Sequence, residues 1–302
     1  MTVLDIVLPY YGNVTLMQRS VLSVLAQTDD RWLLTVVDDG VEPGVPEWFA
    51  GLGHPRVRYR RNQQNLGITG NFQECLRLVE HAHMVMMGCD DVMLPNYVAT
   101  VIGLLERFPE ATIVQPGVQV VDGDGRATRT LVDETKKWLH NSQSPGTAVL
   151  EGEGLAVSLL HGNWLYFPSL CWRSDALKSV GFDERLVVIQ DLAAVLPLLE
   201  RGAKLVVSDE LCFQYRRHAV SVSSARALQG SRFVEERRYF EDVARRMQAH
   251  GWHRAARAAR WHISSRLHAL TMLPTAVRRR DGAGVRVLTS HAFGPPRAQQ
   301  SV

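Results

Sequence analysis

Residues 20–40 read SVLSVLAQTDDRWLLTVVDDG, which places a helix pattern, a strand pattern and a pair of acids in succession. The apolar residues before the loop fall near one helical face: Leu16, Val21, Val24 and Leu25. The continuous apolar run 32–37 predicts a buried strand, which ends at Asp38 and Asp39. Such runs are typical of strands covered on both faces. The stretch therefore predicts half of a β-α-β unit.

The alternation continues on both sides of this stretch. A strand is predicted at 4–8, another at 57–61, a helix at 68–79 and a fourth strand at 83–87. Short strands that alternate with helices indicate a parallel sheet flanked by helices. We therefore predict an α/β fold for this part of the chain.

The same patterns predict the later elements. Helices are expected at 95–108, 153–161 and 191–201, and strands at 112–121, 204–208 and 211–216. Residues 122–146 read as an irregular insertion, to which we assign no function. The sheet-forming part of the chain is expected to end near residue 224.

Pairs of acids follow two of the predicted strands, at Asp38-Asp39 and at Asp90-Asp91. Open parallel sheets bind ligands beyond the carboxyl ends of their strands, where loops and helix N-termini converge. A pair of aspartates alone is also typical of a solvated turn. Carboxylates at such an edge suit a hard dication such as Mg²⁺ or Mn²⁺, which holds phosphate oxygens.

Composition narrows the class of protein. The chain has 302 residues, of which 46% are apolar and 22% charged, and these values exclude disordered and fibrous classes. Its four cysteines lack the paired spacing of a zinc ribbon or a thioredoxin-like motif. The N-terminus lacks a signal-peptide pattern, and no run of about 18 apolar residues occurs. We therefore expect a cytoplasmic protein.

The charge is distributed unevenly along the chain. Residues 225–302 contain fifteen arginines, no lysine and five acids, a net charge of +10, so the first 224 residues carry 3 − 10 = −7. Apolar residues recur at helical spacing among these arginines, which predicts two amphipathic helices over 226–273, broken near Gly251, and a third short helix after Pro274. The tail is therefore expected to form a separate helical extension.

Several ordered motifs resemble family 2 glycosyltransferases with the GT-A fold, of the bacterial cell-envelope polysaccharide type. They are IVLPYYGN (6–13), the opening stretch, NQQNLGITGN (62–71), GCDDVMLP (88–95), WRSDALKSVGFDE (172–184), QDLAAVLPLLERG (190–202) and YRRHAVSVS (215–223). The resemblance covers roughly residues 1–224. It implies a mixed sheet flanked by helices, with a nucleotide-sugar-binding half (1–110), an acceptor-binding half (111–224) and the arginine-rich extension (225–302).

The resemblance also implies roles for residues that bind the donor. Pro9 and Tyr11 would lie beneath the nucleobase, and Asp39 would hydrogen-bond to its edge. Asn65 would help to shape the donor site, although an Asn before Gly67 also fits a left-handed turn. Without the family pattern, turn chemistry and strand packing would explain the same residues.

The resemblance implies that one acid of the pair binds the metal and that the other approaches the ribose. Asp91 corresponds to the family acid that ligates Mn²⁺ or Mg²⁺, and Asp90 to the acid that approaches the ribose. The chain departs from the commoner pattern at Gly88 and Cys89, where an earlier acid and a small residue often stand. His218 corresponds to a histidine that ligates the metal or the diphosphate in similar enzymes, and a purely structural role is the alternative.

Asp191 is the candidate catalytic base, because inverting transfer needs a carboxylate that accepts the proton of the acceptor hydroxyl. The family usually has Glu-Asp here, whereas this chain has Gln190-Asp191. The alternative is a helix N-cap aspartate, and both roles are compatible. Trp164 and Trp172 could stack on an acceptor sugar, although aromatic stretches often form core.

The tail allows two hypotheses. Its arginines could attach the protein to anionic lipid on the inner face of the membrane, or its helices could form a homodimer interface. Nucleic-acid binding is not expected, because the positive charge lacks any recognisable motif.

We predict an inverting, metal-dependent hexosyl- or deoxyhexosyltransferase that uses a UDP- or dTDP-sugar. The expected acceptor is a hydroxyl of a glycan or lipid-linked oligosaccharide; glycosylation of a secondary metabolite and a non-catalytic nucleotide-sugar-binding protein are the alternatives. A nicotinamide-dependent enzyme is disfavoured, because PYYGN lacks the G-x-G-x-x-G pattern. A nucleotidyltransferase is disfavoured by the Asp191 helix and the YRRH segment.

Overall fold

The computed structural model describes residues 2–128, 146–186, 189–217, 231–278 and 280–294. They form two compact units. The sheet unit comprises residues up to 151 together with 165–217, and the helical unit comprises 152–164 together with the described residues from 231 onwards. A boundary at residue 224 lies outside the described residues, so the predicted division of the chain there stays a proposal.

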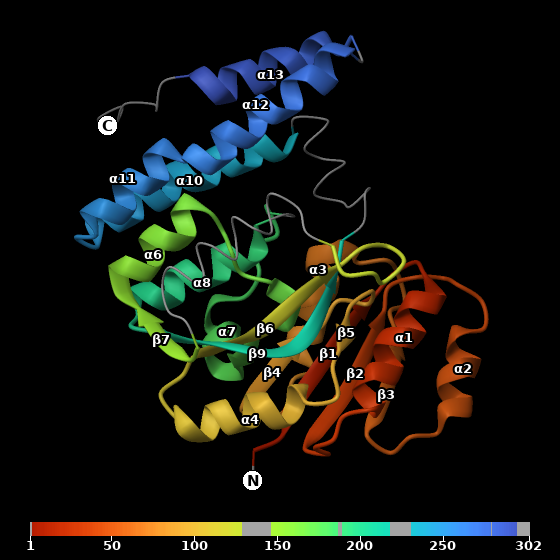
Figure 1. The fold of residues 1–302 in the computed structure, drawn as a ribbon. Coiled ribbons are helices and arrows are strands. Elements are labelled where there is room, and N and C mark those ends of the chain that lie inside the picture. Colours follow the sequence, from red (N-terminus) through yellow and green to blue (C-terminus); the bar gives the residue numbers. More distant parts are fainter. Residues whose placement is uncertain (1, 129–145, 187–188, 218–230, 279, 295–302) are drawn as a thin grey trace. The chain divides into compact units, whose positions relative to one another are not determined.

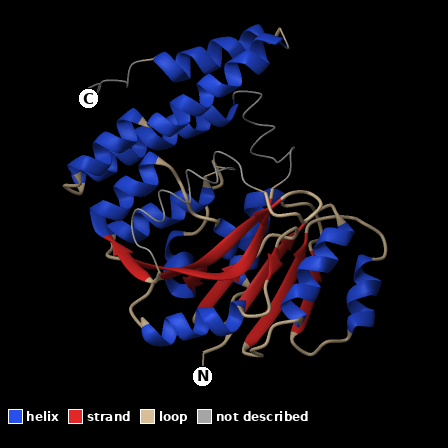
Figure 2. Cartoon of the chain, in the orientation of Figure 1, coloured by secondary structure: helices blue, strands red, loops and turns tan. Residues whose placement is uncertain are grey.

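The sheet unit contains one mixed sheet in the order β3-β2-β1-β4-β8-β6-β9-β5, with β7 paired to β9 (Figure 2). Its strands are β1 (Leu4–Tyr10), β2 (Trp32–Asp38), β3 (Val57–Arg61), β4 (His83–Met86), β5 (Val92–Met93), β6 (Ile113–Val121), β7 (Ala148–Glu151), β8 (Cys171–Arg173) and β9 (Lys204–Arg216). The first four strands are parallel, and β8 runs antiparallel to both β4 and β6. The predicted α/β class with a mixed sheet is confirmed.

Helices cover both faces of this sheet (Figure 1). They are α1 (Val14–Leu25), α2 (Val45–Leu52), α3 (Gly67–Arg77), α4 (Tyr97–Arg107), α7 (Ser174–Val180) and α8 (Gln190–Glu200), with a 3-10 turn η1 (Phe167–Ser169). On one face, Leu4, Ile6 and Leu8 of β1 join side chains of α1, α2 and α4 in a common core. On the other face α3 packs on β1 and β2. The sheet is therefore buried on both sides, as the apolar runs predicted.

Local chemistry sets the element boundaries next to the site. The Asn13 side chain accepts a hydrogen bond from the Leu16 amide at 2.9 Å and caps α1, whose N-terminus follows β1 directly. Strand β3 has the predicted bounds, whereas the two strands predicted after residue 204 are one strand, β9. Helix α2 was not predicted, although Val45, Trp48, Phe49 and Leu52 recur at helical spacing within its eight residues.

The described helical unit consists of α6 (Gly152–His161), α10 (Ser231–Ala249), α11 (His253–Trp261), α12 (Ile263–Arg278) and α13 (Gly282–Phe293). The prediction of two helices before residue 273 was wrong. The chain breaks a second time at His262, which adopts the left-handed conformation with φ +41°. Pro274 lies inside α12, and the helix expected after it is α13, which begins at Gly282. Among the described residues, no helix is both long and apolar enough to cross a bilayer.

Candidate functional site

The site forms where β2, β1 and β4 end side by side. These neighbouring strands are parallel, with Tyr10 of β1 paired to Asp38 of β2, so their carboxyl ends lie at one edge of the sheet. The backbone amide of Asp39 donates to the Tyr10 carbonyl at 2.8 Å, which holds the two loops together. Pro9 is half-buried in β1, while Tyr11, directly after it, is 66% exposed. The edge therefore offers an exposed ring next to a buried acid.

Asp39 is buried against the start of α3. Its Oδ1 accepts hydrogen bonds from the Asn62 side chain and the Leu66 amide, both at 2.8 Å. Its Oδ2 accepts one from the Gly67 amide at 2.9 Å. A carboxylate oxygen can accept two hydrogen bonds, so among the described residues Oδ2 has room for one further donor. Asp39 thus fixes the helix N-terminus and retains capacity for a ligand.

Asn65 contributes to the same loop. Its side chain donates to the Asp39 carbonyl at 2.8 Å, and its oxygen accepts from the Gly67 amide at 3.1 Å. Gly67, with φ +70°, takes the left-handed conformation, and Asn65 does not. The alternative of a left-handed Asn65 is therefore wrong, because glycine adopts that conformation at lower cost.

Asp91 lies in the turn between β4 and β5 with only 1% of its surface exposed. Its Oδ1 accepts from the Arg216 amide at 2.8 Å, and its carbonyl accepts from the Ser20 hydroxyl at 2.6 Å. Burial, followed by the charge of Asp90, holds the pKa of the Asp91 carboxyl well above its usual range. A buried carboxylate beside a second one is unfavourable until a cation neutralises the pair. The two acids therefore fit a divalent metal.

Gly88 explains the departure from the commoner acidic pattern. A Cβ added there would lie under 3.0 Å from Oδ2 of Asp91 and 3.2 Å from Oδ1 of Asp90. A side chain at this position would push both carboxylates out of place. Glycine at residue 88 therefore permits the close approach of the acids to the end of β4.

The substitution Gly88→Ala should lower the free energy of unfolding by about 1–3 kcal/mol, because the added methyl group displaces the Asp91 carboxylate from the Arg216 amide. Urea unfolding measures this change. Gly103→Ala is the matched control in α4, since a Cβ there meets nothing within 4 Å, and it should stabilise by roughly 0.5–1 kcal/mol. Equal stability of the two variants would contradict the steric account.

Arg216 is an organising residue that the sequence analysis did not single out. Its Nε donates to the Asp90 carbonyl at 2.8 Å, and its Nη1 donates to the carbonyls of Asp122 and Gly123 at 3.0 Å each. Only 6% of its surface is exposed. A buried guanidinium needs acceptors for its donors, so its place at the end of β9 fixes the loop after β4. The YRRH motif contained the only sequence signal for this role.

The phenol of Tyr215 is influenced both by the candidate metal-binding acids and by Asp191. Burial, the largest cause, and the charges of Asp91, Asp90 and Asp191 together raise its pKa to about 12, while the charge of Arg217 lowers it in part. All three acids therefore lie within electrostatic reach of one phenol. The rings of Tyr166 and Tyr215 pack with centroids 5.4 Å apart.

Asp191 stands in the first turn of α8 and is 9% exposed. The N-cap position belongs to Ile189, and the carboxylate accepts from the Leu192 amide at 2.7 Å. The expected alternative of an N-cap aspartate is therefore wrong. A carboxylate in a first helical turn is stabilised by the helix dipole.

Gln190 has a packing reason to be an amide rather than a carboxylate. Its Nε2 donates to Thr69 of α3 at 3.0 Å and to the carbonyl oxygens of Asp183 and Leu186, while its Oε1 accepts from the Asp183 amide at 3.1 Å. A glutamate could not donate to two carbonyls. This departure from the family pattern therefore supports the loop that precedes Asp191.

The two aromatic candidates for acceptor binding are buried and belong to different units. Trp172 is 0% exposed in the sheet unit, and Trp164 is 1% exposed in the helical unit, where its indole donates to Ser158 at 3.1 Å. This burial favours a packing role for both rings.

Two further side chains bear on the metal. Burial and the charge of Asp90 raise the pKa of Cys89, next to the acidic pair, to about 12. His218, the second expected ligand, lies outside the described residues.

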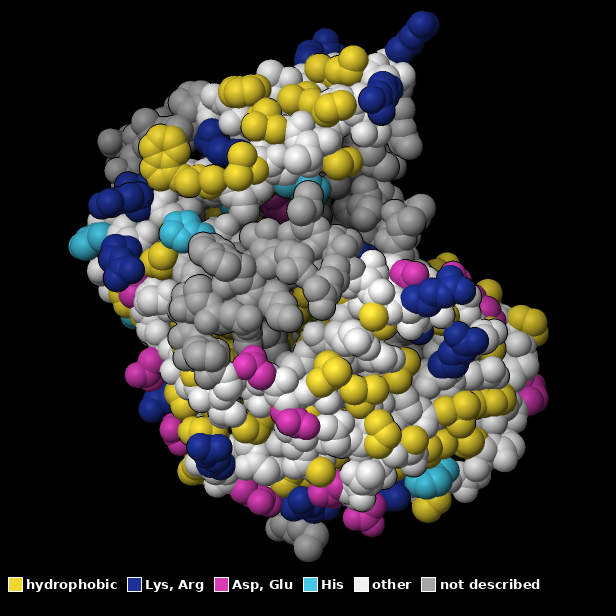
Figure 3. Space-filling view, in the orientation of Figure 1, with side chains coloured by type: hydrophobic (Ala, Val, Ile, Leu, Met, Phe, Trp, Pro, Cys, Tyr) yellow, Lys and Arg dark blue, Asp and Glu magenta, His cyan; other side chains and the backbone are white. Residues whose placement is uncertain are grey.

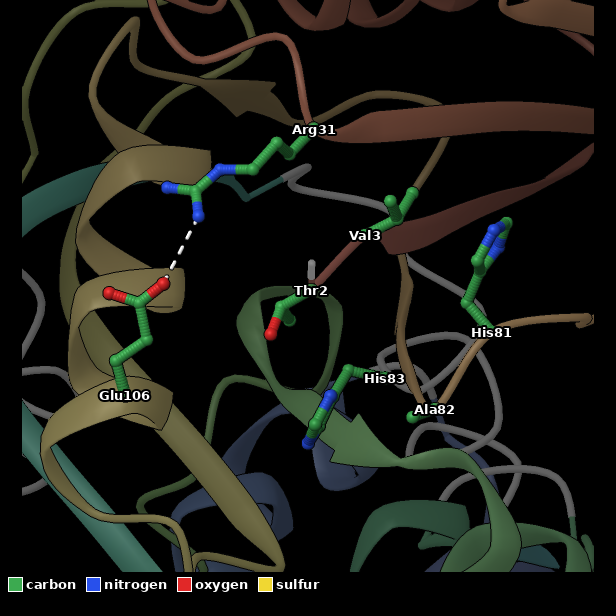
Figure 4. Close-up of a pocket in the computed structure, with 7 residues that line it drawn as sticks. All are labelled: Thr2, Val3, Arg31, His81, Ala82, His83 and Glu106. Carbon is green, nitrogen blue, oxygen red and sulfur yellow. Dashed lines mark hydrogen bonds and ion pairs between the residues drawn. The ribbon is translucent and has the colours of Figure 1, made fainter.

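A cavity of about 540 Å³ lies at the opposite edge of the sheet unit, at the amino ends of the strands (Figure 4). Its lining residues are Thr2, Val3, Arg31, His81, Ala82, His83 and Glu106. The Arg31 and Glu106 side chains point toward one another across it and form an ion pair at 3.1 Å. None of the predicted site residues lines this cavity, so it is separate from the acidic edge.

Comparison with known proteins relates this geometry to a family. A family model described as glycosyl transferase family 2 matches residues 5–166. The uncharacterized protein MT1568 of Mycobacterium tuberculosis is 26% identical over 246 residues, which cover 78% of this chain and 73% of that protein. An uncharacterized glycosyltransferase of Rickettsia felis is 22% identical over 71% of this chain, and the chain spans 34% of that relative's length.

Solved structures share the fold. Residues 1–349 of S. aureus TarS, in complex with UDP-GlcNAc, superpose with a TM-score of 0.61 at 12% identity, over 97% of this chain and 93% of that one. The complex of the same TarS segment with UDP gives a TM-score of 0.59 at 13% identity, over 100% of this chain and 94% of that one. At these identities the similarity shows a shared fold alone.

Proposed function

The chain belongs to glycosyl transferase family 2 and has the GT-A fold, and from this premise we propose that it performs an inverting, metal-dependent transfer of a sugar from a UDP- or dTDP-sugar to a hydroxyl of a glycan or lipid-linked acceptor. One observation carries the proposal. The pKa of Tyr215 is raised by the charges of Asp90, Asp91 and Asp191, although Asp191 lies about a hundred residues after the other two in the chain. The donor's diphosphate and the acceptor's hydroxyl need acids in such proximity.

The nucleoside of the donor is assigned to the edge formed by β1 and β2. The remaining acceptor capacity at Oδ2 of Asp39 suits an N–H of the base, and the exposed ring of Tyr11 suits stacking on its face. Pro9 supports this end of β1, Asn65 holds the loop around Asp39, and Asp90 is assigned to the ribose.

The diphosphate is assigned to a Mn²⁺ or Mg²⁺ ion held by Asp91. When bound, such an ion neutralises the phosphate oxygens and the charge that develops on the leaving group. The raised pKa of Asp91 supports this assignment, because a dication would stabilise the ionised form against burial and Asp90. His218 is retained as the second ligand on the family pattern.

Asp191 is assigned as the base that accepts the proton of the attacking hydroxyl. Its place in the first turn of α8 puts the carboxylate at the positive end of the helix dipole. Gln190 fixes the start of the helix without adding a second charge. We assign no acceptor contact to Trp164 or Trp172 in this state, because both rings are buried.

A thermal-shift panel of nucleotide sugars, measured with and without Mn²⁺, tests the function. A UDP- or dTDP-sugar at a hundred times its Kd should stabilise the protein by about 2.7 kcal/mol, and more strongly with the metal than without it. Adenosine diphosphate sugars are the matched controls. Stabilisation by no nucleotide sugar would overturn the proposal.

We also propose that the helical unit makes a peripheral contact with anionic lipid on the inner face of the membrane. Hydrophobic side chains gather among arginines on this unit (Figure 3). Those between 52% and 69% exposed are Trp261, Ile263, Leu267, Val277 and Phe293. Exposed apolar groups beside basic ones suit an interfacial helix.

Flotation with phosphatidylglycerol vesicles tests this contact, with phosphatidylcholine vesicles as the control. Replacing Arg257 and Arg260 together by Gln should weaken binding roughly 30-fold, at about 1 kcal/mol for each charge. Self-association without lipid binding would instead identify the exposed residues as a homodimer interface.

A further inference from the structure

Three side chains of the metal-ligating type meet inside the helical unit. They are Glu236 of α10, His262 between α11 and α12, and His291 of α13, with 3%, 8% and 5% of their surfaces exposed. One potential ligand atom from each lies within 4.8 Å of the others. None of them belongs to the acidic edge of the sheet unit or to the motifs that define the family.

We propose that Glu236, His262 and His291 bind a Zn²⁺ ion that joins three helices of this unit. Two imidazoles and one carboxylate form a recognised zinc donor set. Ligand atoms at about 2.0–2.2 Å from a tetrahedral ion lie roughly 3.3 Å apart, so a small contraction of the observed group completes the site. Oxygen-seeking Mg²⁺ is poorly matched to two imidazoles.

Ser265 of α12 orients two of the ligands. Its hydroxyl donates to Oε2 of Glu236 at 2.5 Å and lies 2.9 Å from Nε2 of His291. A hydroxyl has one hydrogen, so a bond donated to the carboxylate leaves its oxygen to accept from the imidazole. Hydrogen bonds of this kind hold the ligands of metal sites in a fixed orientation.

The backbone at His262 is a second, independent observation. This residue occupies the left-handed region at the end of α11, where its amide donates to the Ala258 carbonyl at 2.9 Å. Glycine is the usual residue at such a helix end, because other side chains pay a steric cost there. The ring stacks on Phe240 with centroids 3.3 Å apart and lies 6.1 Å from the ring of His291. An unfavourable backbone conformation that positions a ligand-type side chain is typical of binding sites.

The surrounding charges select the kind of metal. Arg237 and Arg266 donate to the carbonyls of Ser290 and Gly294 at the end of α13, and their charges oppose a bare cation. Glu236 offsets them in part. Two imidazole ligands favour zinc over magnesium or manganese.

The packing between α12 and α13 gives the ion a structural purpose. Their fully buried cluster consists of Ala269, Ala276, Leu288 and Ala292, with Leu270, Met272, Leu273 and Val285 partly buried against it. Three of the four buried side chains are alanines, which contribute little hydrophobic stabilisation each. An ion held by α10, the α11–α12 junction and α13 would add a link between these helices to their apolar packing (Figure 1).

Metal analysis of the full chain tests the site. After treatment with EDTA and dialysis against Zn²⁺, the wild type should retain about one zinc per chain, and Co²⁺ should give the strong visible bands of a tetrahedral site. His262→Asn, which tolerates the left-handed turn, and His291→Gln should lose both signals. His161→Gln, at an exposed histidine of α6, is the matched control and should retain them.

Two further variants keep the result interpretable. Where His291→Gln does not fold, Ser265→Ala should weaken zinc binding about 10–100-fold while the helical content stays unchanged. Asp91→Asn should retain the zinc, which separates this site from the donor site. Absence of zinc and cobalt binding in the wild type, or binding that survives His262→Asn, would overturn the proposal.

Discussion

Replacing Asp191 by Asn should lower the turnover number of sugar transfer about 10²–10⁴-fold, the range that a general base contributes. The amide keeps the shape of the side chain and can still accept from the Leu192 amide, so α8 should start where it does now. It cannot take the proton of the acceptor hydroxyl. Donor binding should remain within a few fold, since the nucleotide is assigned to other residues.

Initial rates of nucleotide release with saturating acceptor measure this effect, and the donor Kd is measured separately. Asp175→Asn is the matched control, because Asp175 lies in the first turn of α7 with its side chain 74% exposed. A turnover number within threefold of the wild type would remove Asp191 from the catalytic role. A loss of donor binding instead would identify it as a binding residue.

Replacing Asp91 by Asn should abolish the metal-dependent part of donor binding and slow transfer about 10²–10³-fold, as expected when one preorganised electrostatic contact is lost. The metal-free protein should be no less stable than the wild type. The substitution removes a buried charge whose pKa is raised by burial and by Asp90, while the Arg216 amide retains an oxygen acceptor. Stability without metal should therefore be retained, whereas the rate of sugar transfer should fall.

Thermal shifts with Mn²⁺, with the nucleotide and with both together separate these effects. Asp124→Asn is the matched control, because its side chain is 72% exposed and pairs only with a neighbouring arginine among its described contacts. A metal-dependent shift that persists in Asp91→Asn would place the ion elsewhere. A lower melting temperature without metal would show that Asp91 acts mainly through its hydrogen bond to Arg216.

Local patterns were sufficient for the half of the chain that forms the donor edge. Strand β3 has the predicted bounds, and β1 and β2 extend only slightly beyond theirs, because buried parallel strands consist of continuous apolar runs. The placement of Asp39 and Asp91 at one edge followed from the same patterns, since parallel neighbours end together. The second break in the tail was missed, because His262 takes a conformation that its residue type does not indicate.

The reasons for Gly88 and Gln190 could not be obtained from the sequence. Each looked like a defect in the family pattern when considered alone. The first makes room for two carboxylates, and the second donates to carbonyl oxygens of a loop that precedes it. Such reasons depend on atoms contributed by other parts of the chain, which no local pattern specifies.

The sequence by itself determined the α/β class, the family and the acids at the strand ends, because strand and helix periods are local properties of the chain. Only the tertiary structure decided that Arg216 holds the loop after β4 and that Asp191 shares an electrostatic neighbourhood with Asp91. It alone brought Glu236 and His291 together across three helices. Contacts between distant residues arise from packing and charge in three dimensions, and the order of residues along a chain does not encode them locally.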